Sequence, residues 1–446
     1  MSGSAFGSSL FARQTLPNSN ESKKVPTVSA WVNATLLPVD KPPISGGAIV
    51  VQDGKIQAVG ASANVAIPAN ATIVDAKGKW IMPGLICTHS HIGGAGAADG
   101  SGPIQPGVRV MDSINVRDSG FRRALAGGLT TLNIMPGSGH LISGQTVYCK
   151  LRYYESSPRI VDEILIRDQN GAPVGGLKMA NGTNSQGDSP FPGTRGKSAY
   201  LVREQYIKAR EYQAKVVAAN GDASKLPPRD LHLESLVEAM QGKRIVHHHT
   251  HRHDDIMTVI RLSQEFGFQT VLHHVSEGWK VAKEIADAKM PCSIIVLDSP
   301  GGKVEAKDMT FSNGRVLDEA GVKVAFHTDD WITDSRLFMR SAALAVRAGM
   351  NRDKAIAGLT LAGAEMLGLS DRIGSLSVGK DADFAILNGD PLSVYSHVLE
   401  TWVEGKKAFD LSKPDDQLYA EGGVNAGSDI DPFLCCFAPA WQGGAK

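Results

Sequence analysis

The sequence contains few of the features that define disulfide-stapled, secreted or membrane proteins. Five cysteines among 446 residues form an odd and sparse set, which favours a reduced interior over a disulfide framework. No run approaches the roughly 18 consecutive apolar residues of a membrane helix. The beginning of the chain lacks the short apolar core of a secretory signal. We therefore expect a cytoplasmic protein that makes no membrane contact.

An excess of charge of one sign is also lacking. The 46 Lys and Arg residues balance the 46 Asp and Glu residues, and the basic residues are scattered along the chain. A nucleic-acid partner requires a basic stripe or patch, so we expect none. Apolar residues make up 42% of the sequence, and its length suffices for a full-sized core and a smaller companion module.

β-type patterns occur near both ends of the chain. Short runs follow one another between residues 28 and 84, with a hairpin signal at Asp53-Gly54 and a turn at 77–79, which predicts a small antiparallel module. The β pattern returns near Ile373, with another tight turn at Glu404-Gly405. The economical interpretation is one discontinuous β module formed by both ends, with another domain inserted between them.

Between these ends, strand-like apolar runs alternate with helical stretches, as in successive βα units with a parallel sheet. The eight runs are 85–91, 129–135, 146–152, 175–181, 244–250, 269–275, 292–297 and 322–329. Eight such runs fit a closed (β/α)₈ TIM-like barrel, which typically needs about 250 residues. The predicted division has a flexible arm at 1–26, a β-sandwich domain at 27–84 and 375–412, the barrel at 85–374 and a tail at 413–446.

Five of the eight runs carry a residue that can bind a metal at or near the end of the strand, where the active sites of such barrels lie. His89 and His91 are two residues apart on a strand, so both side chains point to one face and can hold one cation. The alternative is a pair of ordinary histidines that cap the strand.

Lys178 lies inside an apolar strand, between Leu177 and Met179, where an unpaired ammonium is costly to bury. A lysine whose pKa is lowered by burial can add carbon dioxide and become a carbamate, an anionic ligand able to bridge two divalent ions. The alternatives are a lysine that extends its amine to solvent and an anchor for a substrate carboxylate.

Histidines also crowd the end of the fifth run, at positions 247, 248, 249, 251 and 253, and spacing alone does not choose among them because alternate residues diverge. His274 lies near the end of the sixth run, and Asp329 ends the eighth. A carboxylate there can bind a metal and also take the proton from an attacking water, as metal-assisted hydrolysis requires. Polar residues that only form hydrogen bonds at the barrel mouth are the alternative.

From about Val28 to Asp410 the sequence resembles the amidohydrolase superfamily. Three segments resemble its signatures: IMPGLICTHSH at 81–91, LAGGLTT at 125–131 and VGKDADF at 378–384. Four more are most similar to its imidazolonepropionase-related group: LKMA at 177–180, HRHDDI at 251–256, HVSEG at 274–278 and HTD at 327–329. Lys178 occupies the position of the carboxylated lysine in prolidase-like members.

The resemblance implies a ligand set for two divalent ions, which the imidazole-rich composition suggests are zinc. His89, His91 and Asp329 would hold one ion, and His249 and His274 the other. Lys178 as carbamate and a hydroxide would be shared between the two ions. Asp329 would move the proton to the leaving nitrogen.

The implied activity is hydrolysis of an amide-type C–N bond in a small molecule, such as an N-acyl amino acid, a dipeptide or a cyclic amide. His140 and Arg252 are candidate substrate-binding residues, and the loop at 181–196 is a candidate cover. We expect a homo-oligomer. Two alternatives remain: a mononuclear aminohydrolase similar to imidazolonepropionase, and a scaffold of the same fold without catalysis.

Overall fold

The computed structural model describes residues 28–94, 99–154, 157–296, 303–330 and 332–422. Strands from both ends of this range form one eight-stranded sheet in the order β17-β16-β15-β5-β1-β2-β3, and β4 pairs with β1. Its strands are β1 (Val28–Leu36), β2 (Ile44–Gln52), β3 (Lys55–Ala61), β4 (Thr72–Asp75), β5 (Trp80–Pro83), β15 (Phe384–Leu387), β16 (Val398–Val403) and β17 (Lys406–Asp410). The two ends of the chain thus meet in one sheet.

Two hairpins of this sheet form where the sequence predicts them. Asp53 and Gly54 adopt φ values of 51° and 78° between β2 and β3, and Glu404 and Gly405 adopt 49° and 70° between β16 and β17. Two consecutive positive φ values match the right-handed twist of the strands they join. The expectation of a purely antiparallel module is wrong, because β4 and β5 both run parallel to β1.

The remaining strands form a six-stranded sheet, β14-β13-β12-β11-β10-β8, and a three-stranded sheet, β6-β7-β9. Each of the eight predicted runs contains a strand. Residue 297, the last of the run 292–297, lies outside the described residues. The strands are β6 (Leu85–Ser90), β7 (Leu129–Ile134), β8 (Ile142–Gln145), β9 (Val147–Lys150), β10 (Leu177–Ala180), β11 (Val246–Thr250), β12 (Thr270–His274), β13 (Cys292–Ile294) and β14 (Val324–Phe326).

The third run does not form the predicted parallel strand. Strand β9 is antiparallel to β7, and β8, which the sequence analysis missed, is antiparallel to β10. Only Thr146 separates β8 from β9. A parallel neighbour of β7 needs a long crossover, usually a helix, whereas residues 135–146 between β7 and β9 contain the strand β8 and no helix.

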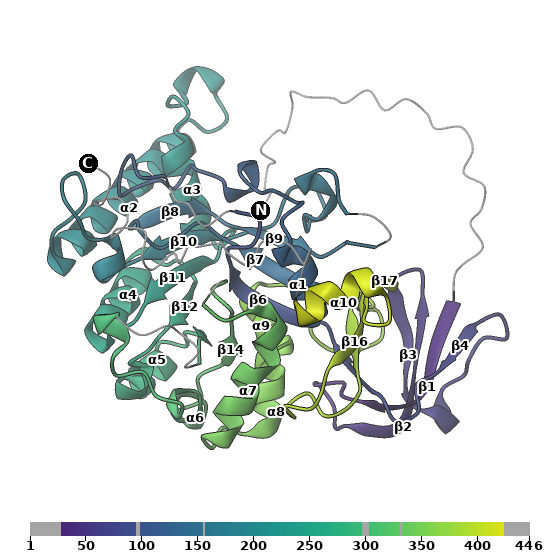
Figure 1. The fold of residues 1–446 in the computed structure, drawn as a ribbon. Coiled ribbons are helices and arrows are strands. Elements are labelled where there is room, and N and C mark those ends of the chain that lie inside the picture. Colours follow the sequence, from purple (N-terminus) through teal and green to yellow (C-terminus); the bar gives the residue numbers. More distant parts are fainter. Residues whose placement is uncertain (1–27, 95–98, 155–156, 297–302, 331, 423–446) are drawn as a thin grey trace.

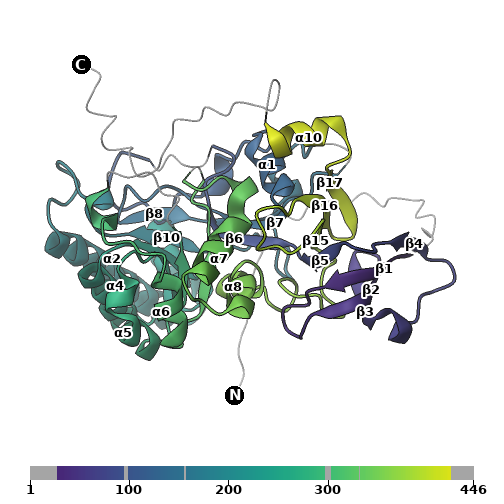
Figure 2. The same cartoon turned by 60° about the horizontal axis from the view of Figure 1, so that its bottom comes forward.

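Helices cover the outer side of these strands, and the eight-stranded sheet lies beside them in both views (Figures 1 and 2). The helices are α1 (Gly120–Ala126), α2 (Arg195–Ala218), α3 (Leu231–Met240), α4 (His253–Phe266), α5 (Ala282–Asp287), α6 (Asn313–Glu319), α7 (Phe338–Arg347), α8 (Arg352–Gly358), α9 (Leu361–Met366) and α10 (Pro414–Glu421). Among the described residues, none of them combines the length and apolar character that a bilayer crossing requires.

Two predicted terminal segments fall partly or wholly outside the description. The arm at 1–26 lies outside the described residues, and so does the tail from residue 423 onward. The described part of the tail forms α10, which packs against α1 and β17.

A buried lysine connects the three-stranded sheet to the segment that leads into β15. Lys150, on β9, is fully buried and forms ion pairs with Asp381, with Asp383 at 2.9 Å and with Glu404 at 3.3 Å. Burial alone would lower the pKa of Lys150, but the three carboxylates raise it. The same cluster lowers the pKa of Glu404 to about 2, against the effect of its burial, mainly through Arg152 and Lys150. Lys150 is therefore a charged residue that stabilises the contact between the two parts.

Replacing this lysine tests its structural role. Lys150→Met should lower the free energy of unfolding by about 3 kcal/mol or more, because it leaves buried carboxylates without their cation. Lys55→Met is the matched control: Lys55 pairs with the same Asp381 but is 45% exposed, so the loss should stay below about 1 kcal/mol. Equal losses in urea unfolding would contradict the assignment.

Candidate metal centre

Five strands bring the six candidate ligands to one place. β6 carries His89 and is followed by His91, β10 carries Lys178, β11 carries His249, β12 ends at His274, and Asp329 follows β14. All six side chains are buried; His91 is the most exposed, at 5%. The ends of β6 and β14 are joined by a backbone hydrogen bond in which the Asp329 N–H donates to the His89 carbonyl at 3.1 Å.

The first group consists of His89, His91 and Asp329. The two Nε2 atoms lie 3.1 Å apart, and Asp329 Oδ1 lies 3.2 Å from His89 Nε2 and 3.0 Å from His91 Nε2. Ligands at zinc distances of roughly 2.0–2.1 Å in a tetrahedron lie about 3.3 Å apart. The three atoms therefore have nearly the spacing of one face of a zinc site. His91 Nδ1 donates to the Met135 carbonyl at 2.8 Å, which fixes the ring with Nε2 toward the group.

Lys178 lies directly beside this group. Its Nζ is 3.2 Å from His89 Nε2 and 3.1 Å from Met135 Sδ, and the side chain is fully buried. The sequence-based alternative of a lysine that extends its amine to solvent is therefore wrong.

The second group consists of His249, His251 and His274, whose ligand atoms lie within 4.8 Å of one another. The rings of His249 and His274 have centroids 4.3 Å apart. His251 Nδ1 donates to Ser276 Oγ at 2.7 Å, which directs Nε2 toward the group. Buried His249 Nδ1 and His274 Nε2 form no hydrogen bond in the described structure. Buried ring nitrogens of this kind usually have a partner, and a cation would provide one for this imidazole set.

Backbone conformation connects the two groups. His274 and Asp329 have φ values of 70° and 48°, in the left-handed region that non-glycine residues rarely adopt. Along an extended strand His273 and His274 would point to opposite faces, whereas here both rings lie 5.1 Å from the His89 ring. His274 Nδ1 thereby comes within 3.9 Å of Asp329 Oδ2. Backbone strain of this type concentrates at functional sites.

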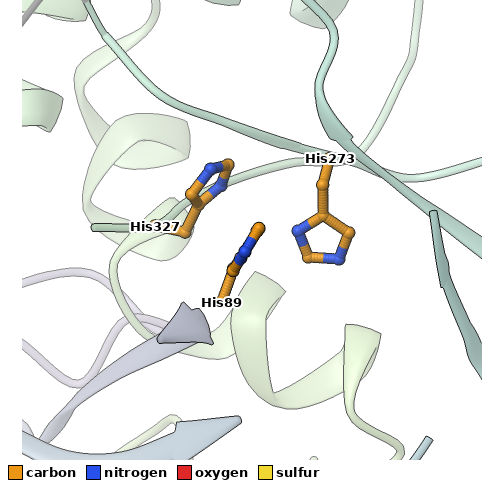
Figure 3. Close-up of side chains that lie close together, drawn as sticks. All are labelled: His89, His273 and His327. Atoms are coloured by element: carbon orange, nitrogen blue, oxygen red, sulfur yellow. The ribbon is translucent and has the colours of Figure 1, made fainter. Parts of the chain in front are cut away.

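A further layer of histidines lies next to His89. Figure 3 shows the rings of His89, His273 and His327 directed toward one another, and their ligand atoms lie within 4.8 Å. His273 Nε2 is 3.0 Å from His247 Nδ1, and His327 Nδ1 is 2.8 Å from Ser293 Oγ. The sequence analysis did not place His273 or His327 in the site. The sequence does contain a signal for His327. It lies two residues before Asp329, the same spacing as between His89 and His91.

Burial keeps these imidazoles neutral. It is the largest cause that lowers the pKa of His89, His249 and His274 well below its usual value, and neighbouring positive groups lower it further. Burial would raise the pKa of Asp329, but its contact with His91 and nearby positive charge hold it below the usual value. At neutral pH the site therefore offers neutral imidazole nitrogens at His89, His249 and His274 and one carboxylate, the protonation states that metal binding requires.

Among the described residues, neither candidate substrate-binding residue forms a hydrogen bond to these groups. The hydrogen bonds of Arg252 in the described structure go to Asp254, at 3.0 Å and 2.9 Å. His140 is buried beside Phe191 of the predicted cover loop, with ring centroids 5.3 Å apart, and burial lowers its pKa. Their proposed roles stay predictions.

Comparison with known proteins shows the family to which this chain belongs. Residues 207–409 match a family model described as Amidohydrolase family. The crystal structure of an amidohydrolase from Thermotoga maritima MSB8 is 33% identical, covers 85% of this chain and 99% of that chain, and has a TM-score of 0.77. Amidohydrolase tasK of Hapsidospora irregularis is 27% identical, over 78% of this chain but only 38% of that protein. An imidazolonepropionase of Rhizobium rhizogenes is 24% identical over 81% of this chain and 91% of that protein.

The chain therefore belongs to the amidohydrolase superfamily and has its TIM-like α/β fold. It is a hydrolase that acts on carbon–nitrogen bonds. The family is metal-dependent, and the buried histidine groups described above form a possible metal site in this chain.

Adjacent histidines on β11 provide a direct test of the second group. His249→Asn should lower the affinity for Zn²⁺ by about tenfold or more, because one imidazole nitrogen of the group is lost. His248→Asn is the control, since the His248 Nδ1–H donates to the His249 carbonyl at 3.0 Å and the residue belongs to neither group. Calorimetric titration of the metal-depleted proteins measures both affinities, and equal weakening would contradict the grouping.

Proposed function

We propose that this protein is a binuclear metal-dependent amidohydrolase that cleaves an amide-type C–N bond of a small molecule. The proposal rests on one observation: six side chains, on or just after five strands that are distant in sequence, lie together in one buried cluster. His89, His91 and Asp329 would hold one divalent ion, and His249 and His274 the other. Zinc suits this imidazole-rich set.

The ions would polarise the scissile carbonyl and lower the pKa of the attacking water. Asp329 is the proton carrier in this proposal. As a carboxylate it would accept a proton from the water and deliver it to the leaving nitrogen. His91, oriented by the hydrogen bond from its Nδ1 to the Met135 carbonyl, would share an ion with Asp329, whose Oδ1 lies 3.0 Å from His91 Nε2.

Lys178 would contribute as a carbamate. Its amine would add to carbon dioxide to form an N–C bond with release of a proton, and the resulting anion would have two oxygens for the two ions. The supporting observations are its complete burial and its position 3.2 Å from His89 Nε2. A carbamate would also remove a positive charge from a buried site that must accept cations.

We further infer the finer architecture around this site. The backbone bond from Asp329 to His89 favours a barrel closed between β14 and β6. The shared sheet of both chain ends favours a β-sandwich domain of residues 27–84 and 375–412 around the barrel of 85–374. Homo-oligomerisation stays a prediction.

Removal of the proton carrier tests the reaction class. Asp329→Asn should lower kcat on an amide substrate by roughly 10²–10⁴-fold, because general acid–base transfer typically contributes that much. The substrate is found by screening zinc-loaded protein, with and without chelator, on N-acyl amino acids, dipeptides and cyclic amides.

Asp330→Asn is the matched control for this experiment. The Asp330 carboxylate accepts hydrogen bonds from Ser90 at 2.8 Å, Thr328 and Ser335, all hydroxyl groups outside the ligand set. Its replacement should reduce kcat far less than Asp329→Asn. Comparable losses, or turnover that survives metal removal, would contradict the proposed mechanism.

Bicarbonate dependence tests the carbamate. Metal-depleted protein should bind a second Zn²⁺ per chain about tenfold more tightly in bicarbonate-supplemented than in carbon-dioxide-free buffer, because the bridging ligand forms only with carbon dioxide. Lys178→Met should abolish the dependence. One ion per chain in both buffers, with Lys178→Met unaltered, would instead support a mononuclear aminohydrolase.

A further inference from the structure

A lysine from outside the predicted ligand set reaches into the second histidine group. Lys303 precedes the short helix η7 (Val304–Ala306), in the connection that follows β13. Its ammonium donates to His249 Nε2 at 3.2 Å and to His251 Nε2 at 2.9 Å. Sequence reasoning had no means of finding Lys303, because nothing in the pattern GGKVEAKD indicates that this connection returns to the histidines.

The position of Lys303 is fixed by an anchor two residues later. Glu305 is buried and accepts a hydrogen bond from the Thr183 N–H at 2.8 Å. It also pairs with Arg195, which in turn binds Asp255 at 2.9 Å. These contacts tie the connection after β13 to those after β10 and β11.

The close approach of Glu305 depends on a glycine. Gly182 has a φ of 75°, and a Cβ atom there would lie 2.8 Å from the Glu305 carboxylate oxygens. The backbone of the β10 connection is therefore shaped to receive Glu305. The contacts of Glu305 with Thr183 and Arg195 therefore fix the position of the residues next to Lys303.

In the described structure, the charge of Lys303 lies beside imidazoles rather than carboxylates. Among the described residues, no Asp or Glu oxygen lies within ion-pair distance of Lys303, and its hydrogen bonds go only to two neutral imidazoles. A cation on His249, whose Nδ1 forms no hydrogen bond in the described structure, would lie close to the Lys303 ammonium on Nε2 of the same ring. An ammonium retained beside such a cation is stabilised by an anion that both can share.

We propose that Lys303 binds the carboxylate of the substrate, so that the preferred substrates are N-acyl α-amino acids or dipeptides rather than neutral or cyclic amides. This inference rests on the proposed function and specifies its substrate class. In an N-acyl amino acid the carboxyl carbon is two bonds from the amide nitrogen, so a carboxylate held by Lys303 keeps the scissile bond beside His249 and His251. Arg252, the other candidate anchor, is paired with Asp254.

Substrate pairs that differ only in this charge test the assignment. For zinc-loaded protein, kcat/KM is measured on an N-acetyl amino acid and on its primary amide. Lys303→Met should lower the ratio of acid to amide at least about 30-fold, mainly through KM, because a charged hydrogen bond in ground-state binding is lost. Lys303→Arg should restore much of the ratio, and the control Lys307→Met on the same segment should keep it.

A binding experiment keeps this test independent of turnover. Wild-type zinc-loaded protein should bind succinic acid monohydroxamate at least about tenfold more tightly than acetohydroxamate, and Lys303→Met should lose that preference. The role of Lys303 would be overturned by any of three results: no carboxylate preference in the wild type, equal losses of kcat/KM on both substrates in Lys303→Met, or an altered zinc content of that variant. If the preference holds but no amide is hydrolysed, the proposed function fails and the carboxylate site stands.

Discussion

The burial of neutral imidazoles around one carboxylate is the constraint on which the site depends. In water these histidines would be partly protonated near neutral pH, but burial lowers the pKa of His89, His249 and His274 so far that their lone pairs remain available. Asp329 stays ionised because its contacts with His91 outweigh the cost of its burial. The result is a possible metal site, with the buried Lys178 beside it.

Two buried ion-pair networks join parts of the chain that are distant in sequence. Lys150 joins β9 to the segment that leads into β15, through the carboxylates of Asp381 and Asp383. Glu305 and Arg195 join the segment after β13, which carries Lys303 to the second histidine group, to the segment after β10. Both networks place a charged residue in a buried environment with counter-charges around it, so the removal of one partner leaves an uncompensated buried charge.

The sequence predicted much of the fold and less of the site. Each of the eight predicted apolar runs contains a strand, because strands buried in a sheet are rich in apolar residues, although β8 was missed. They did not reveal that residues 147–150 run antiparallel, since strand direction depends on the length of the connection and not on the pattern within the strand. The hairpins at Asp53-Gly54 and Glu404-Gly405 were predictable because their positive φ values demand particular residues.

The candidate ligands could be selected because the strand ends of such a fold converge, so a metal-binding residue at a strand end is a candidate for the active site. His273 was not distinguishable from His274, since only the left-handed φ of His274 directs both rings inward. Lys303 lies in a connection whose path follows from the contacts of Glu305, and contacts across 122 residues of sequence leave no local pattern.

The proposed mechanism requires two divalent ions in this histidine cluster. Diffraction from zinc-soaked crystals, measured on both sides of the zinc absorption edge, locates such ions directly. Two anomalous peaks are expected, one within about 2.0–2.2 Å of His89, His91 and Asp329 and the other at that distance from His249 and His274. The absence of any peak within coordinating distance of these atoms would contradict the mechanism.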